Sequence, residues 1–333
     1  MAGRKSIERK NRRRRRRRRK IKALICAVLE ILIVLTVVLI AGWKFGIGSW
    51  LSQLGSPAVK SLDLSGITST HAILIQAKSG KTVGQIDADE VVYPASLTKI
   101  MTAIVAIEHL KDLNQEITLD PDIFPNLYAS DATRAGFEPG ETVRAIDLLY
   151  GVILPSGAEC CIGLADAISG SEEKFVDLMN QKAEKLGMKH THFCDTTGLH
   201  DPDHYSSCRD MAVLLKYAIS NDTFREIIES HWHSTPGTNI HPDGITYYSS
   251  MFKSLSDSSV TGGEILGGKT GFTNDAGLCL ASFAEIEGRE YILVTTGANV
   301  NGAHIQDAVT IYNRIGEAAK AISLLDISRK IWV

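Results

Sequence analysis

The sequence predicts a mixed α/β (α+β) domain, with an antiparallel sheet flanked by helices and a mostly helical subdomain, behind an N-terminal transmembrane helix. β-Rich runs stand near both ends of the chain, at residues 71–86 and 277–296, and helical patterns fill the segment between them. One sheet must therefore be assembled from distant segments. With 333 residues, 44% hydrophobic composition and 9 prolines, the chain can bury a large core and is too apolar to be disordered.

The transmembrane helix is expected at residues 23–43, an apolar run with one charged residue, Glu30. About 20 such residues, at 1.5 Å rise each, cross the ~30 Å hydrocarbon core of a bilayer. A buried globular helix is usually shorter and amphipathic. A cleaved signal peptide is the stronger alternative, but the run exceeds an ordinary signal-peptide core and no small-x-small motif clearly follows it.

The charge is distributed unevenly. Residues 1–22 hold fourteen Lys or Arg and one acid, so the rest of the chain, with 22 basic and 37 acidic residues, has a formal charge of -15. The positive-inside rule then makes residues 1–22 a cytoplasmic tail and places residues 44–333 outside the cytoplasm. Arginine runs also bind nucleic acid, but beside a membrane span they indicate topology and anionic lipid. We expect a single-pass protein of the cell membrane without a nucleic-acid partner.

Between the anchor and the folded body, residues 44–66 contain short apolar pieces interrupted by glycines and Pro57, which is typical of a linker. The folded domain is expected at residues 67–325, followed by a C-terminal tail at 326–333.

Within this domain, Ser79-Gly80 separates two strands of a hairpin, and Glu287-Gly288 joins two longer strands near the C-terminus. Ser171 and Gly187 have the residue types of a helix N-cap and C-cap. Strands are expected at His71–Ala77, Thr82–Ile86, Gly277–Ile286 and Arg289–Thr296. Helices are expected at Leu97–Leu110, Ala145–Ile153, Gly157–Ile168, Ser171–Leu186, Arg209–Ile219 and Ala303–Leu324.

Six cysteines include Cys26 in the predicted span, which leaves an odd number outside the membrane. Cys194 and Cys208 bracket one loop and could close it with a disulfide. Alternatively, all the outer cysteines are small core residues.

Ser96-Leu97-Thr98-Lys99, at the start of a predicted helix, supplies a nucleophile and a base. Residues at i and i+3 share a helix face. If apolar neighbours desolvate Lys99, its pKa falls and the neutral amine can deprotonate Ser96. This pair alone is a weak signal, because Ser and Lys occur three apart by chance in most chains of this length.

Two further motifs support it, Ser156-Gly157-Ala158 after an apolar helix and Lys269-Thr270-Gly271 at the mouth of a predicted strand. The three motifs in this order resemble the penicillin-recognising serine enzymes. The flanking sequences at residues 93–103, 154–157, 198–199 and 204–212 look like D-alanyl-D-alanine carboxypeptidases of the low-molecular-mass penicillin-binding type, over residues 66 to 325.

The resemblance implies a β-lactamase/transpeptidase-like fold and a serine-type carboxypeptidase that needs no cofactor and no metal. Ser96 would be the acylated nucleophile, Lys99 the base and Ser156 the proton relay. The substrate-binding residues would be Lys269, Thr270, Gly271 and Phe272, with Lys269 and Thr270 on the substrate carboxylate and the Ser96 and Phe272 N–H groups forming the oxyanion hole. Its partners would be peptidoglycan stem peptides, with β-lactams as inhibitors.

The chain departs from the family pattern at two places. Ala158 stands where the family usually has Asn, and the loss of a polar contact costs ~1–3 kcal/mol, so activity could be weak or depend on Glu159. The usual arginine near the C-terminal helix has no obvious counterpart, although His304 lies in that region. A penicillin- or wall-peptide-binding module without turnover and a β-lactamase-like hydrolase therefore stay open as alternatives.

Two other site classes are less compatible with the sequence. Residues 263–270 match the spacing of a phosphate-binding loop, but a polar segment precedes them and a predicted strand follows. A zinc peptidase is suggested by seven histidines between residues 190 and 241, although no His-Glu-x-x-His motif is present.

Overall fold

The computed structural model describes residues 59–331. The predicted tail at 1–22, the anchor at 23–43 and most of the linker lie outside this range. Across the helices that are described, none combines the length and the apolar character needed to cross a bilayer.

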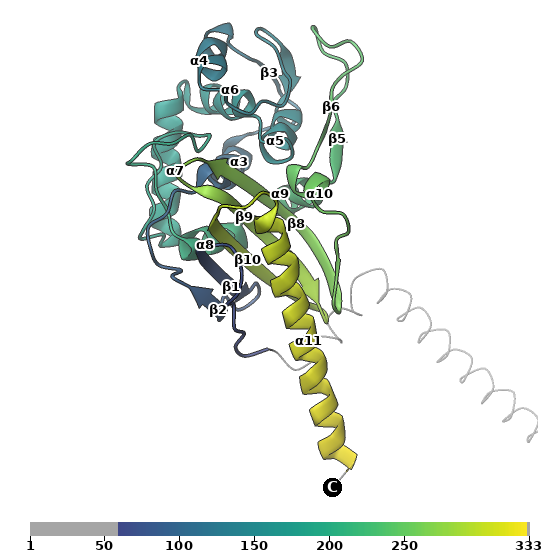
Figure 1. The fold of residues 1–333 in the computed structure, drawn as a ribbon. Helices are drawn as coiled ribbons and strands as arrows, with labels where there is room; N and C mark the ends of the chain where they lie inside the picture. Colours follow the sequence, from purple (N-terminus) through teal and green to yellow (C-terminus); the bar gives the residue numbers. More distant parts are fainter. Residues whose placement is uncertain (1–58, 332–333) are drawn as a thin grey trace, which may run out of the picture. The chain divides into compact units, whose positions relative to one another are not determined.

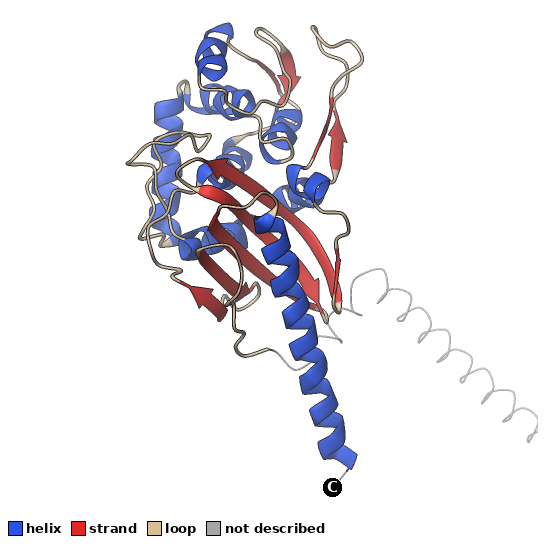
Figure 2. Cartoon of the chain, viewed as in Figure 1, coloured by secondary structure: helices blue, strands red, loops and turns tan. Residues whose placement is uncertain are grey.

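A six-stranded antiparallel sheet forms the centre of the domain (Figures 1 and 2). Segments from the two ends of the domain meet where β1 pairs with β10, with Ile73 opposite Val294. The predicted sheet built from distant segments is therefore confirmed. In spatial order the strands are β2 (Thr82–Ile86), β1 (His71–Gln76), β10 (Arg289–Ala298), β9 (Gly277–Ile286), β8 (Gly263–Thr273) and β7 (Ser259–Val260).

The turn between β9 and β10 lies at Glu287-Gly288, where the sequence predicts it. Ile286 pairs with Arg289, which leaves a two-residue loop of Glu287 and Gly288, both with positive φ. Two left-handed residues give the turn whose twist matches antiparallel strands.

Helices cover both faces of the sheet, so the domain has two hydrophobic cores, one on each face. On one face, α11 (Ala303–Ile331) packs Ile311 and Tyr312 against residues such as Leu293 of β10. On the other face, α8 (Cys208–Ala218) and α3 (Lys99–His109) pack against the sheet and the remaining helices. Figure 1 shows α11 lying along the sheet and extending past its edge.

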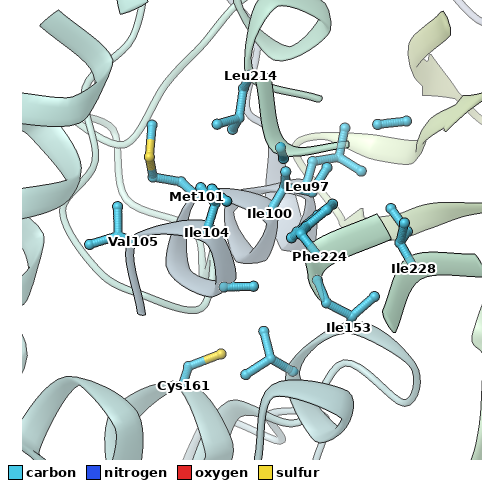
Figure 3. Packing of buried hydrophobic residues seen from close by; sticks show 14 of the residues in the cluster. Leu97, Ile100, Met101, Ile104, Val105, Ile153, Cys161, Leu214, Phe224 and Ile228 are labelled. Atoms are coloured by element: carbon cyan, nitrogen blue, oxygen red, sulfur yellow. The ribbon is translucent and has the colours of Figure 1, made fainter. Parts of the chain in front are cut away.

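The helix α3 is the centre of the larger core. Its first eight residues are buried, including the polar side chain of Lys99. Figure 3 shows its apolar side chains surrounded by residues of four other helices. Those helices are α5 (Ala145–Ile153), α6 (Ala158–Ser169), α8 and α9 (Asp222–Glu229), which contribute Ile153, Cys161, Leu214, Phe224 and Ile228.

The helical subdomain also contains α4 (Phe124–Ala129) and α7 (Glu172–Leu186). The Ser171 hydroxyl accepts a hydrogen bond from the Lys174 N–H, and Gly187 ends α7 with φ +75°. Both predicted caps of this helix are therefore confirmed. Several short elements were not predicted: β3 (Glu116–Thr118), β4 (Thr142–Arg144), β5 (Trp232–Ser234), β6 (Thr246–Tyr248), α10 (Ser250–Ser254) and the 3-10 turn η2 (Pro121–Ile123).

Two helix boundaries differ from the prediction by more than one residue. The helix expected from Leu97 begins as a 3-10 turn, η1 (Ala95–Thr98), before α3. The closing helix continues to Ile331, into the segment predicted as a tail.

Of the two alternatives for the cysteines, the disulfide between Cys194 and Cys208 is not formed, because the five cysteines in the described range are all free. Cys208 is buried at the start of α8, with its Sγ 3.6 Å from Thr296 Oγ1. The Sγ of Cys194 instead lies 3.7 Å from His192 Nδ1.

Candidate active site

A cleft of about 430 Å³ opens beside the start of α3. The predicted residues Ser96, Lys99 and Phe272 all line it. Five separate stretches of chain form its walls, so the cleft exists only in the folded protein. They contribute Ser96, Lys99, residues 130–133, Ala158, residues 197–200 and residues 272–275.

Ser96 and Lys99 face each other at the junction of η1 and α3. Lys99 Nζ lies 3.1 Å from Ser96 Oγ. The change from a 3-10 turn to an α-helix at this point brings the two side chains together, and Ala95 adopts φ +47° just before the serine. The spacing is that of a hydrogen bond through which a proton can pass.

The surroundings of Lys99 favour its neutral form. The side chain is 3% exposed, and burial lowers the pKa of the amine below its ordinary value of 10.5. The charges of Cys161 and Asp195 act in the opposite direction but do not cancel the effect of burial. Lys99 Nζ also donates a 2.6 Å hydrogen bond to the Thr197 carbonyl, which orients the amine.

A buried polar network holds that carbonyl in place. Asp195 Oδ1 accepts hydrogen bonds from the N–H groups of Thr197 and Gly198, both 2.6 Å long. Asp195 Oδ2 lies 3.3 Å from Nδ1 of His204, whose Nε2 is 2.8 Å from the Thr98 hydroxyl. Sequence reasoning missed this network, although Asp followed by Thr-Thr-Gly is a signal for a turn closed by the aspartate side chain.

Replacing Asp195 by asparagine is expected to lower the free energy of unfolding by about 2 kcal/mol at pH 7. Burial alone would raise the pKa of Asp195, but hydrogen bonds from His204 and Thr197 hold it at about 2, below the ordinary 3.8. A depressed carboxyl pKa stabilises the fold above about pH 4, and this contribution is lost as the pH falls towards 2.

Urea unfolding at pH 7 and pH 3 measures both effects. The Asp195→Asn variant should lose stability mainly at pH 7, so that its difference from the wild type shrinks at pH 3. The exposed Asp203→Asn change serves as control, and equal losses from both changes would contradict the assignment.

Lys269-Thr270-Gly271 lies within β8, not ahead of a strand as predicted. Lys269 is fully buried, and burial together with the charge of Lys99 lowers the pKa of its amine well below the ordinary value. A Cβ on Gly271 would stand 3.0 Å from the Ser96 N atom, so glycine permits β8 to approach the serine closely. Phe272 follows with 59% of its surface exposed.

Ser156 and Ala158 stand at the two ends of the second motif and differ in their relation to the cleft. Ser156 has φ +71°, and its buried Oγ has no hydrogen-bond partner within residues 59–331. Ala158 lines the cleft, whereas Ser156 does not. Within residues 59–331, no hydrogen bond therefore joins Ser156 to Ser96 or Lys99.

Glu159 does not replace the missing amide of position 158. Its Oε1 accepts hydrogen bonds from the N–H groups of Ala135, Gly136 and Phe137, at 2.6 to 3.3 Å. The side chain therefore holds a neighbouring loop and is not among the cleft-lining residues, and a dependence of activity on Glu159 stays a prediction. His304, at the start of α11, is buried and is not among the cleft-lining residues.

The phosphate-binding loop is contradicted by the sheet. Residues Gly263–Thr273 are strand β8, paired with β9 along its length. A phosphate-binding loop instead joins a strand to a helix, whose N-terminus holds the anion.

Three of the histidines that suggested zinc belong to separate pairs with carboxylates. His204, His233 and His241 lie beside Asp195, Asp147 and Glu141, respectively. In the part of the chain that the structure describes, no three His, Cys, Asp or Glu side chains gather as a metal site would require.

The chain is similar in sequence to a family of known proteins. The D-alanyl-D-alanine carboxypeptidase family profile matches residues 58–300. The carboxypeptidase DacF of Bacillus subtilis is 30% identical over 230 residues, covering 68% of this chain and 57% of the relative. DacC of Escherichia coli is 39% identical over 170 residues, covering 49% of this chain and 42% of the relative. The chain thus spans about half the length of these curated relatives.

Two solved structures are similar over most of the described fold. The DD-transpeptidase of Streptomyces superposes with a TM-score of 0.68 at 27% identity, covering 75% of this chain and 97% of that one. Penicillin binding protein 5 from Haemophilus influenzae gives a TM-score of 0.66 at 28% identity, covering 74% of this chain and 70% of that one. With its matched profile and its sheet-and-helix fold, this chain belongs to the D-alanyl-D-alanine carboxypeptidase family.

Proposed function

We propose that this protein removes the terminal D-alanine from peptidoglycan stem peptides through a serine acyl-enzyme, and that β-lactams inhibit it by acylating the same serine. The observation that carries the proposal is the 3.1 Å approach of Lys99 Nζ to Ser96 Oγ in an open cleft. Family membership supplies the substrate class.

In the first step, the neutral Lys99 amine accepts the Ser96 hydroxyl proton as Oγ attacks the carbonyl carbon of the penultimate D-alanine. The N–H groups of Ser96 and Phe272 stabilise the negative charge that develops on the carbonyl oxygen. The tetrahedral intermediate then breaks its C–N bond, and the departing amine of D-alanine takes up a proton, with Ser156 as the relay. Water hydrolyses the ester and restores Ser96.

Substrate binding is assigned to β8. Lys269 and Thr270 bind the terminal carboxylate, which provides the counter-charge that the buried lysine lacks among its described neighbours. Thr270 is oriented by α10, because its Oγ1 lies 2.7 Å from Ser250 Oγ. A carboxylate at this place also favours the protonated form of Lys269, compared with the free protein.

We also propose that residues 23–43 anchor the protein in the cell membrane, with the basic tail 1–22 in the cytoplasm. The support is the apolar run and the arginine-rich segment before it. The enzyme would then act where its wall substrate is found.

The function is tested by incubating the full-length protein with diacetyl-L-lysyl-D-alanyl-D-alanine and measuring free D-alanine. We expect release that benzylpenicillin abolishes and a chelator leaves unchanged. Stoichiometric penicillin labelling without any release would favour a binding module, and rapid turnover of penicillin itself would favour a β-lactamase. Release that a chelator stops and penicillin does not affect would overturn the serine mechanism.

A further inference from the structure

A second hollow, of about 520 Å³, adjoins the catalytic cleft at the end of β8. It shares Phe272 and Asn274 with that cleft. The start of β9 and the segment between β10 and α11 complete it. Its lining residues are Phe272, Asn274, Gly277, Leu278, Ala298, Asn299 and Asn301.

The lining combines apolar surface with amides and holds no charged side chain. Asn274, Asn299 and Asn301 are exposed, and none of their side chains has a hydrogen-bond partner among the described residues. Each amide offers donors and an acceptor, so together they suit a neutral ligand group that both donates and accepts. Phe272 and Leu278 add apolar surface beside them.

A carboxylate would be poorly accommodated here. The asparagine N–H groups could donate hydrogen bonds to it, but the lining holds no cation to balance its charge. The nearest charged group along the chain is Asp275, an acid with 52% of its side chain exposed. A ligand carboxylate and the Asp275 carboxylate would repel each other at short range.

The position of the hollow follows from the direction of the bound substrate. Under the proposed function, the terminal carboxylate lies at Thr270 and the reacting carbonyl lies at the Phe272 N–H. The substrate therefore runs along β8 in the direction of Asn274, with its upstream residues beyond Phe272. An extended chain advances ~3.3 Å per residue, as a strand does, so the residue before the two D-alanines reaches the hollow.

We propose that this hollow binds the side chain of the stem-peptide residue that precedes D-alanyl-D-alanine, and that it selects a side chain ending in a neutral amide over one ending in a free carboxylate. The inference rests on the proposed function for the direction of the substrate. It adds a specificity that the catalytic residues do not determine, because they contact only the two D-alanines.

The test uses two isosteric peptides, N-acetyl-L-glutaminyl-D-alanyl-D-alanine and N-acetyl-L-glutamyl-D-alanyl-D-alanine, with the full-length protein at pH 7. We expect kcat/KM for D-alanine release to be about tenfold higher for the glutaminyl peptide. The Asn299→Lys variant should reverse this preference, because it supplies a cation to the hollow. Asn126→Lys adds the same charge on the exposed surface of α4 and should leave the tenfold ratio as it is.

Binding of both peptides to the full-length Ser96→Ala variant, measured by calorimetry, separates this inference from the reaction. A preference for the glutaminyl peptide in binding without D-alanine release from wild type would leave the hollow assigned and overturn the proposed function. Release from both peptides at equal rates, or an equal response of the ratio to Asn299→Lys and Asn126→Lys, would overturn the inference.

Discussion

Replacing Lys99 by methionine is expected to slow acylation by benzylpenicillin about 10²–10⁴-fold, the usual contribution of a positioned general base. Methionine fills similar buried volume but cannot accept the Ser96 proton. The rate is measured by stopping the reaction at intervals and recording the mass of the intact protein. Lys111→Met, at an exposed lysine, is the control, and an unchanged rate in Lys99→Met would remove the lysine from the mechanism.

The same variant should change the dependence on pH. The pKa of Lys99 is lowered by burial, so the wild-type acylation rate should rise as the pH increases through that value and the amine loses its proton. In the unfolded chain the Lys99 amine keeps its proton up to its ordinary pKa of about 10.5. The free energy of unfolding therefore also increases with pH between the lowered pKa of the folded protein and this ordinary value. In Lys99→Met, the acylation rate should no longer increase with pH over this range, and the increase in the free energy of unfolding that comes from Lys99 should be absent.

Replacing Gly198 by alanine is expected to lower the free energy of unfolding by more than about 2 kcal/mol, and to slow acylation as well. Gly198 has φ +81°, and a Cβ there would stand 1.9 Å from the Ala95 carbonyl oxygen. The loop must move to relieve that clash, and the Thr197 carbonyl that orients Lys99 moves with it. Thermal unfolding and the acylation rate give the two measurements.

Gly187→Ala provides a matched control for backbone strain. Gly187 has φ +75°, but a Cβ at this position would have no other atom within 4 Å. Alanine should therefore cost only the ~1 kcal/mol of a left-handed residue, with no effect on acylation. Equal effects of the two substitutions on acylation would show that the loop at Gly198 does not position the site.

Much of the fold could be predicted because its signals are local. The bounds of α5 at Ala145–Ile153 and of β9 at Gly277–Ile286 agree with the sequence patterns. The β3–β4 and β5–β6 hairpins were missed because strands of three residues show too little alternation to detect. β8 was not predicted as a strand, because glycines at four of its eleven positions hide its strand character.

The site was predictable only where its residues are close in sequence. Ser96 and Lys99 are one helical turn apart, so their approach follows from local structure. Thr98 and His204 are 106 residues apart, and only the fold brings them together with Asp195. The partners of Glu159 were not predictable for the same reason, since they are backbone N–H groups of a separate loop at residues 135–137.

Acylation of Ser96 is the central step of the proposed mechanism, and intact-protein mass after benzylpenicillin tests it most directly. We predict that the full-length protein gains the mass of one benzylpenicillin, that peptide mapping places the adduct on Ser96, and that Ser96→Ala gains nothing. An unmodified wild-type protein that still releases D-alanine, or an adduct that persists in Ser96→Ala, would contradict it.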